Sequence, residues 1–178
     1  GSKNLKSNNT LGTIVGIYDD PVPAPGQSLV AAAYVLYGAI TSMMVAADGR
    51  AVEYVIEDGE RRTLQESVML PETPEVYGFG GRTADWTEEF AGFAREVQRD
   101  RGLKTRYGGS MVGDVNQILT FGGIYAYPAS AAHEAGKLRL QFEANPIAYI
   151  VESAGGHSSD GNGSILNTTV TDLHQRTP

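Results

Sequence analysis

Two Asp-Gly pairs in the first third of the chain constrain the fold more than any other feature. Asp48-Gly49 and Asp58-Gly59 are each flanked by segments rich in β-branched and aromatic residues. Asp-Gly is a preferred sequence for the tight turn that joins two antiparallel strands. We therefore predict strands over 40–47, 51–57 and 61–70, which run up and down as a section of antiparallel sheet.

The segments before these hairpins predict one more strand and one helix. Residues 11–18 form a β-rich run that we expect to be a buried strand. Residues 19–26 contain three prolines and predict a loop. Ser28 stands where a helix N-cap would stand, and apolar residues follow it at helical spacing. The pattern predicts a helix from Ser28 that ends at Gly38.

Beyond residue 70 the pattern changes to strands that alternate with helices. Residues 71–74 contain two prolines and indicate a linker or domain boundary. Trp86, Phe90, Phe93 and Val97 recur at the spacing of an amphipathic helix. Further periodic segments predict a helix from residue 111, strands over 122–127 and 138–142, and a helix that Asn145-Pro146 begins and Gly155-Gly156 ends. We therefore expect an α/β fold, with mixed sheets and flanking helices in layers.

Composition excludes several classes of function. The net charge of −7 over 178 residues argues against non-specific binding of nucleic acid. The absence of cysteine excludes a disulfide framework, a thiolate metal site and a cysteine nucleophile. The longest apolar run, 29–36, is too short to cross a bilayer. We expect a cytoplasmic protein with neither a nucleic acid nor a membrane as partner.

Segment 137–143 carries the most informative set of polar residues. In a strand, Lys137, Arg139 and Glu143 would share one face with Gln141, and the apolar residues between them would face a core. Cations can stabilise phosphate oxygens, and a carboxylate can hold Mg²⁺. The same alternation is also typical of a solvent-exposed edge strand with no ligand.

Two further segments have chemistry that suits an anion. Residues 106–110, Arg-Tyr-Gly-Gly-Ser, precede a predicted helix, and free N–H groups at a helix N-terminus bind anions. The alternative is an ordinary loop with Ser110 as the N-cap. Tyr125 and Tyr127 share a strand face, where their hydroxyls can donate to a phosphate. The alternative is that the rings are half-buried at the edge of a core and the hydroxyls contact solvent.

These segments together resemble class I fructose-1,6-bisphosphatases along nearly the whole chain. Residues 12–18 resemble the strand that follows the family's metal motif, and residues 29–38 resemble its next helix. Residues 106–115, 136–149 and 171–176 resemble other family segments, and Lys-Leu-Arg-Leu at 137–140 is the most diagnostic of them. The resemblance implies the sugar phosphatase fold.

The resemblance also implies a role for the polar residues named above. Arg139 and Glu143 become the expected catalytic residues, with Arg139 near the phosphate that leaves and Glu143 as a metal ligand. Lys137 is expected to contact the sugar ring oxygens and a phosphate. Tyr107 and Tyr127 are expected to hold the distal 6-phosphate.

Other substrate-binding positions follow from the same resemblance. The backbone from Gly109 through Ser110 to Met111 is expected to line the sugar. Arg106 is expected to reach the pocket of a neighbouring subunit, which implies a homo-oligomer, with a tetramer as the expected number.

The chain departs from the family at two pocket positions. Gly80 stands where the family has Asn, and Thr83 stands where it has Tyr. Two phosphate contacts therefore change, and we expect the neighbouring Arg82 to compensate.

The beginning of the chain raises a question about the metal. In the family, an Asp-Pro-x-Asp motif precedes the Gly-Ser-x-Asn that Gly1 and Ser2 begin here. We expect Gly1 and Ser2 to lie at the substrate, and the upstream metal ligands to be outside this chain. Accordingly, 1–72 is expected to be the remainder of an amino-terminal metal and allosteric domain, and 73–178 a carboxyl-terminal sugar-phosphate-binding domain.

The implied activity is hydrolysis of the 1-phosphate of fructose 1,6-bisphosphate to fructose 6-phosphate, a step of gluconeogenesis. Mg²⁺ is the expected cofactor, with Mn²⁺ or Zn²⁺ as alternatives. Other interpretations are a non-catalytic sugar-phosphate-binding module, a sedoheptulose bisphosphatase, or an enzyme with inositol-phosphatase-like activity.

Overall fold

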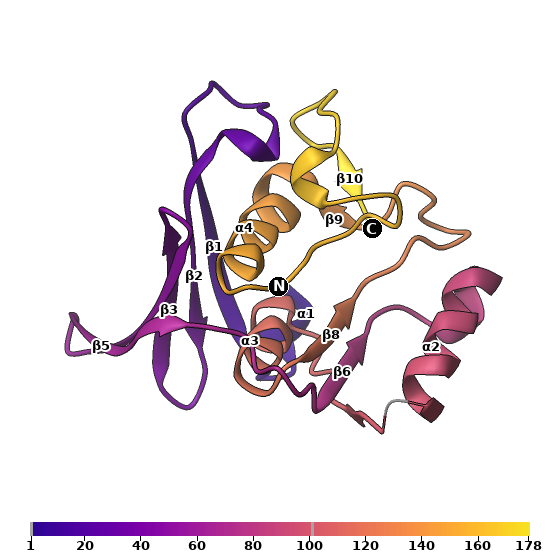
Figure 1. Ribbon diagram of the computed structural model, residues 1–178, viewed down its shortest axis with the longest axis horizontal. Helices are drawn as coiled ribbons and strands as arrows, with labels where there is room; N and C mark the ends of the chain where they lie inside the picture. The colour runs from indigo at the N-terminus through magenta and orange to yellow at the C-terminus, as the bar shows by residue number, and fades with distance from the viewer. Residues whose placement is uncertain (1, 101) are drawn as a thin grey trace.

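The computed structural model describes residues 2–100 and 102–178, and of Ser2 and Asp100 only the backbone. Figure 1 shows a large sheet, a pair of helices beside it, and a smaller sheet with an outer helix. The elements are α1 (Ser2–Lys6), β1 (Leu11–Tyr18), η1 (Gly26–Ser28), β2 (Leu29–Tyr37), β3 (Thr41–Ala47), β4 (Arg50–Glu57), β5 (Glu60–Val68), β6 (Val76–Phe79), η2 (Thr83–Asp85), α2 (Glu88–Asp100), β7 (Lys104–Thr105), α3 (Met111–Phe121), β8 (Gly123–Ala126), β9 (Leu138–Arg139), η3 (Leu140–Ala144), α4 (Asn145–Ser153), η4 (Ile165–Asn167) and β10 (Arg176–Thr177).

The large sheet is antiparallel and has the strand order β1-β2-β3-β4-β5. Both predicted hairpin turns are confirmed: φ is 51° at Asp48, 70° at Gly49, 52° at Asp58 and 80° at Gly59. Two successive left-handed residues form the turn whose twist matches that of the flanking strands. The three predicted strands β3, β4 and β5 follow in the expected order.

The helix predicted from Ser28 to Gly38 is wrong, because residues 29–37 form strand β2. This strand lies between β1 and β3 and pairs with both. Ala32 and Tyr34 are buried beneath the helices, and the intervening Ala33 is partly exposed. Pairing on two sides and packing on one face outweigh the weak helical preference of an alanine-rich segment.

Strand β1 is confirmed as a strand, but the expected burial is wrong. Val15 is 47% exposed and Ile17 is 54% exposed. The strand lies at the edge of the sheet, and only its other face meets the helices. On that face a side chain at Gly12 would meet Val112, and one at Gly16 would meet Pro146.

The smaller sheet has the strand order β7-β6-β8, and β6 is parallel to both neighbours. Helix α3 contacts β1 and β2 of the large sheet and also β6 and β8 of the small one. Helix α4 packs on β1, β2, β3 and β4 (Figure 1). The expected α/β fold, with mixed sheets and flanking helices in layers, is confirmed.

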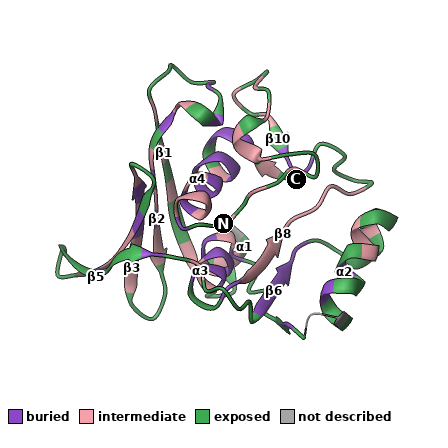
Figure 2. Ribbon diagram, in the orientation of Figure 1, coloured by how far each residue is buried: buried purple, intermediate pink, exposed green. Residues whose placement is uncertain are grey.

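Burial follows these layers, with two hydrophobic clusters (Figure 2). The larger cluster joins the large sheet to α3 and α4, with Tyr34, Leu119 and Ile150 among its members. The smaller cluster packs α2 on β6 through Phe79 and Val97. The amphipathic helix is thus confirmed, although Trp86 precedes its first turn.

The strand predicted over 138–142 ends after two residues, and a π-helical turn, η3, follows it. The expected alternation is therefore wrong: Gln141 is 2% exposed and Phe142 is 38% exposed. Helix α4 begins at Asn145 as predicted, but Asn145 is not its cap, because Ala144 occupies the N-cap position. Because η3 runs directly into α4, the preceding Ala144 is already in the helical conformation.

The division at residue 72 stays a prediction. The larger hydrophobic cluster contains residues from both sides of that position, for example Met44 and Ile147. In the part of the chain that the structure describes, no helix is long and apolar enough to cross a membrane.

Candidate functional site

Lys137, Tyr127 and Tyr107 come together beside Gly80 at the end of the small sheet. Lys137 Nζ donates to the Tyr127 hydroxyl at 3.2 Å and lies 5.3 Å from the centre of its ring. A Cβ atom built on Gly80 would lie 3.0 Å from the Tyr107 hydroxyl. An amine and two phenol hydroxyls therefore lie in one neighbourhood, and all three can donate to an oxyanion.

Tyr107 and Tyr125 keep their phenol protons at neutral pH, because the pKa of each is raised. Burial raises the pKa of Tyr107 above its usual value, and the nearby Tyr127 and Asp114 raise it further. Burial also raises the pKa of Tyr125 well above its usual range, with Tyr107 as the next contributor. A protonated phenol keeps its O–H donor, which is the form that an anionic ligand needs.

Gly80 provides space rather than a ligand. A Cβ atom on it would lie 2.4 Å from a Tyr127 ring carbon, so the ring occupies the place of a side chain. The Gly80 N–H donates to the Ala126 carbonyl at 2.8 Å, and its carbonyl accepts from the Trp86 indole at 3.0 Å. Both backbone polar groups are thus used within the protein.

Thr83 and Arg82 lie on the exposed stretch that follows Gly80. The Arg82 guanidinium pairs with Asp85 at 3.1 Å, and its side chain is 80% exposed. An exposed ion pair of this kind contributes little free energy and can open at small cost. Compensation by Arg82 for the missing family contacts stays a prediction.

The turn before helix α3 is held by a buried carboxylate that the sequence reasoning missed. Asp114 is 2% exposed and accepts from the N–H groups of Gly108 at 2.5 Å and Gly109 at 3.1 Å. Ser110 occupies the N-cap position, but its side chain makes no cap hydrogen bond. Burial raises the pKa of Asp114, and the N–H groups of Gly108, Gly109 and Ser110 oppose that rise.

Arg139 and Glu143 form an ion pair across the π-helical turn. Glu143 Oε2 accepts from the Arg139 backbone N–H at 2.8 Å and from its Nε at 3.3 Å. The Arg139 guanidinium also lies 5.4 Å from the centre of the Phe142 ring. The two predicted catalytic residues are thus adjacent, although helical winding brings them together and not strand alternation.

The described residues do not form a complete metal site. Among residues 2–100 and 102–178, no group of three or more His, Asp and Glu side chains is placed to hold an ion. Glu143 is the expected ligand, and here its carboxylate is paired with Arg139. Mg²⁺ needs six oxygen ligands in near-octahedral geometry, so one carboxylate does not suffice.

The beginning of the chain lies against the Gly108-Gly109 turn. Asn4, on helix α1, donates from Nδ2 to the Gly109 carbonyl at 3.1 Å, and Asn9 donates to the Gly108 carbonyl at 2.6 Å. Of the predicted substrate residues at this end, Gly1 lies outside the described residues, and Ser2 is the first residue of α1.

The remaining predicted residues flank the same turn. Arg106 is exposed, and its backbone N–H donates to the Tyr77 carbonyl at 2.7 Å. Within the part of the chain described, its guanidinium has no carboxylate partner. Met111 begins helix α3 and packs against the larger hydrophobic cluster.

Sequence reasoning missed Asn4, Asn9 and Asp114. Asp114 carried a signal, because a carboxylate in the first turn of a helix after two glycines can accept from the free N–H groups there. No local signal pointed to the asparagines, because their partners are about 100 residues away.

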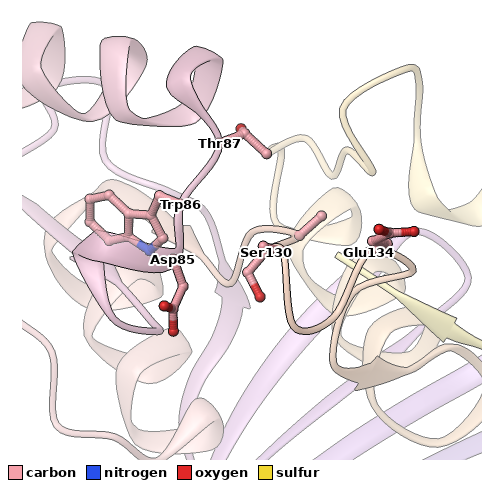
Figure 3. Close-up of a pocket in the computed structure, with 7 residues that line it drawn as sticks. Asp85, Trp86, Thr87, Ser130 and Glu134 are labelled. Atoms are coloured by element: carbon pink, nitrogen blue, oxygen red, sulfur yellow. The ribbon is translucent and has the colours of Figure 1, made fainter.

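A cleft of about 340 Å³ lies elsewhere, between the Asp85–Thr87 stretch and the Ser130–Glu134 loop (Figure 3). Asp85 and Glu134 contribute carboxylates to its lining. An acidic lining disfavours a phosphate, and none of the predicted site residues is part of it.

A family model and the sequences of known proteins identify the same family. The family model described as fructose-1-6-bisphosphatase, C-terminal domain, matches residues 70–178. The chain is 55% identical to a class 1 fructose-1,6-bisphosphatase of Natronomonas pharaonis and 56% identical to one of Halobacterium salinarum. The two alignments cover 100% of this chain, and they cover 62% and 61%, respectively, of those two proteins. The chain therefore spans less than two thirds of the length of these relatives.

Solved structures agree with the sequence comparisons. The fructose-1,6-bisphosphatase of Leishmania major in its holo form matches with a TM-score of 0.94 at 34% identity, over 100% of this chain and 62% of that one. Its apo form matches with a TM-score of 0.92 at 32% identity, over 100% of this chain and 64% of that one.

Proposed function

Because this chain belongs to the fructose-1,6-bisphosphatase family, we propose that it carries the sugar-phosphate-binding part of an enzyme that hydrolyses the 1-phosphate of fructose 1,6-bisphosphate. The observation that carries the proposal is the cluster of Lys137, Tyr127 and Tyr107. An amine and two phenol hydroxyls lie together there, with Lys137 Nζ 3.2 Å from the Tyr127 hydroxyl, and all three can donate to an oxyanion. Such a donor set suits a phosphate ester.

We assign the distal 6-phosphate to Tyr107 and Tyr127, and the sugar ring oxygens to Lys137 and the backbone of 109–111. The Arg176 guanidinium donates to the Lys137 carbonyl at 2.7 Å and so steadies Lys137, which directly precedes strand β9. In this arrangement Gly80 leaves room for the Tyr127 ring, and Thr83 lies beyond it.

Arg139 is assigned to the phosphate that leaves. Its guanidinium is partly exposed, and Arg139 is the last residue of the short strand β9, which directly follows Lys137. Negative charge grows on the departing oxygens in the transition state, so a nearby guanidinium acts more strongly there than on the bound substrate. To meet the phosphate, Arg139 must release or share Glu143.

The proposed metal is Mg²⁺, which would help to activate water and screen the leaving oxygen. Glu143 is proposed as one of its ligands. The described residues supply no cluster of further carboxylates, and we propose that waters, the substrate phosphate and a segment present in the longer relatives complete the coordination.

A second candidate is a non-catalytic sugar-phosphate-binding module. It is favoured by the lack of a metal-ligand cluster among residues 2–100 and 102–178. Both candidates use the same cluster of donors, and they differ only in whether a complete metal site is present.

We also propose a homo-oligomer, with four subunits as the expected number, in which Arg106 reaches a neighbouring pocket. An exposed guanidinium with no carboxylate partner in the described chain supports this role. A cytoplasmic location is proposed on the same family basis.

Two measurements test the proposal. Calorimetric titration should show that the chain binds fructose 6-phosphate, and that Lys137→Met weakens binding at least about tenfold, since a charge-assisted contact is lost. Phosphate release from fructose 1,6-bisphosphate with excess Mg²⁺ then separates the candidates. We expect turnover only when the chain is joined to the segment that its relatives have in addition. Turnover by the chain alone would refute the inference that further metal ligands are needed.

A further inference from the structure

Each backbone N–H and each carbonyl of Gly108 and Gly109 forms a hydrogen bond with a side chain. The two N–H groups of this turn donate to the two carboxylate oxygens of Asp114. Its two carbonyls accept from the amides of Asn4 and Asn9. Two exposed glycines would otherwise be among the most mobile positions of a chain, because no side chain restricts them.

The three side chains come from separate parts of the fold. Asp114 lies in the first turn of α3, Asn4 on α1, and Asn9 on the connection between α1 and β1. The asparagines are themselves oriented, since Asn9 Oδ1 accepts from the Thr10 N–H at 2.8 Å and Asn4 Nδ2 also donates to the Thr10 carbonyl at 3.3 Å. The turn is therefore fixed relative to both the helix behind it and the beginning of the chain.

This fixation matters for a ligand because the turn connects two binding segments. Tyr107 precedes it directly, and Ser110 and Met111 follow it. A turn that is already rigid loses little conformational freedom when a sugar binds, and pre-organisation of this kind increases affinity.

We propose that Asn4, Asn9 and Asp114 are positioning residues, which clamp the Gly108-Gly109 turn so that Tyr107 and the 109–111 backbone meet the sugar phosphate together. This inference rests on the proposed function. It assigns to the α1 segment a part in sugar recognition that is separate from any contact of its own with the ligand.

The test uses Asn4→Ala, Asn9→Ala and the double variant, all at partly or fully exposed positions where folding should persist. Ser7→Ala is the matched control, because among the described residues its hydroxyl bonds to the Lys3 and Asn4 carbonyls of its own segment and not to the turn. Calorimetry measures the Kd for fructose 6-phosphate and, separately, for orthophosphate, which does not need the sugar contacts.

We expect each asparagine variant to weaken fructose 6-phosphate binding by about 3- to 10-fold, the equivalent of one net hydrogen bond. Orthophosphate binding should weaken by a smaller factor, because only its contact with Tyr107 depends on the clamp, and the control should change less than about twofold. Faster amide hydrogen exchange at Gly108 and Gly109 should accompany the loss.

Each other outcome overturns the inference in a distinct way. If the wild-type chain binds fructose 6-phosphate and the asparagine variants bind it equally well, the clamp has no role in recognition and the proposed function survives. If both ligands weaken by the same factor, the 109–111 backbone adds no sugar contact that depends on the clamp, and the inference that the clamp aligns both segments fails. If the wild-type chain binds neither ligand, the proposed function and the clamp both fail.

Discussion

Gly80 and Tyr127 share a single space in the candidate site. The ring of Tyr127 lies where a side chain at position 80 would begin, and the ring in turn meets Lys137. The departure from the family at position 80 is therefore coupled to the position of a neighbouring tyrosine. A substitution at either residue should therefore alter the packing of the other.

We predict that Gly80→Ala lowers the free energy of unfolding by about 1–3 kcal/mol, because the added methyl overlaps the partly buried Tyr127 ring. In a Tyr127→Ala background the same change should cost much less, since the ring is gone. Urea denaturation of the four proteins of this double-mutant cycle measures the coupling. Additive effects would show that the ring moves away without cost.

Arg139 gives a prediction for the reaction. In the enzyme that includes the additional segment of the relatives, Arg139→Ala should lower the turnover rate by about 100-fold or more, while the Kd for fructose 6-phosphate changes less than about threefold. The guanidinium is assigned to charge that develops in the transition state. Steady-state rates and product binding measure the two effects, and an unchanged turnover rate would remove Arg139 from its assigned role.

At the scale of elements, the π-helical turn η3 decides how the predicted catalytic residues meet. It places Glu143 one turn beyond Arg139, where backbone and guanidinium both donate to the carboxylate. The turn is fastened by Gln141, whose buried amide donates to the Ala24 carbonyl at 2.8 Å and accepts from the Ala24 N–H at 2.9 Å. A loop far away in sequence thus holds the turn in place.

We predict that Gln141→Ala lowers the free energy of unfolding by about 2–4 kcal/mol, since two buried backbone groups of Ala24 lose their partners. Gln27→Ala is the matched control, because the Gln27 amide bonds to Asn167 at an exposed position. Its cost should stay within about 0.5 kcal/mol. Equal costs in chemical denaturation would show that the Gln141 contacts do not hold the turn.

At the scale of the whole molecule, helix α3 joins the two sheets, and α4 packs on the large one. The large sheet buries one face on these helices, and α3 also contacts β6 and β8 of the small sheet. The site lies where the small sheet, the beginning of α3 and the end of the chain meet. Global stability and the geometry of the site therefore depend on the same packing.

The free energy of unfolding should depend on pH in a way that reflects the burial of a carboxyl group in this packing. Burial raises the pKa of Glu53, which lies on the helix-facing side of strand β4 beside Tyr34. A folded-state pKa above the unfolded value contributes stability below the unfolded pKa, and this contribution is lost as pH rises through the folded value. Between about pH 4 and pH 7, unfolding free energy should thus fall less in Glu53→Gln than in the wild type.

Chemical denaturation across this pH range measures the difference. Glu66→Gln, at an exposed position on the neighbouring strand β5, is the control and should keep the wild-type slope. A Glu53→Gln slope equal to that of the wild type would show that burial of Glu53 has no energetic effect.

Most of the fold followed from local patterns in the sequence. The Asp-Gly turns, the amphipathic helix of Phe90 and Val97, and the helix after residue 110 are all found as predicted, because each pattern determines its own local conformation. The segment from Leu29 failed for a reason of context. Its alanine-rich spacing suits a helix, but pairing with strands on both sides made it the second strand of the large sheet.

For the site, the sequence by itself indicated residue types and their family, including Lys137, Arg139, Glu143 and the two tyrosines. Only the tertiary structure decided how they meet. The π-helical turn replaced an expected strand, the Tyr127 ring filled the space at Gly80, and two distant asparagines fixed the Gly108-Gly109 turn together with the nearby Asp114. Sequence patterns report interactions between near neighbours, whereas these contacts join residues up to 105 positions apart and form only when the layers pack.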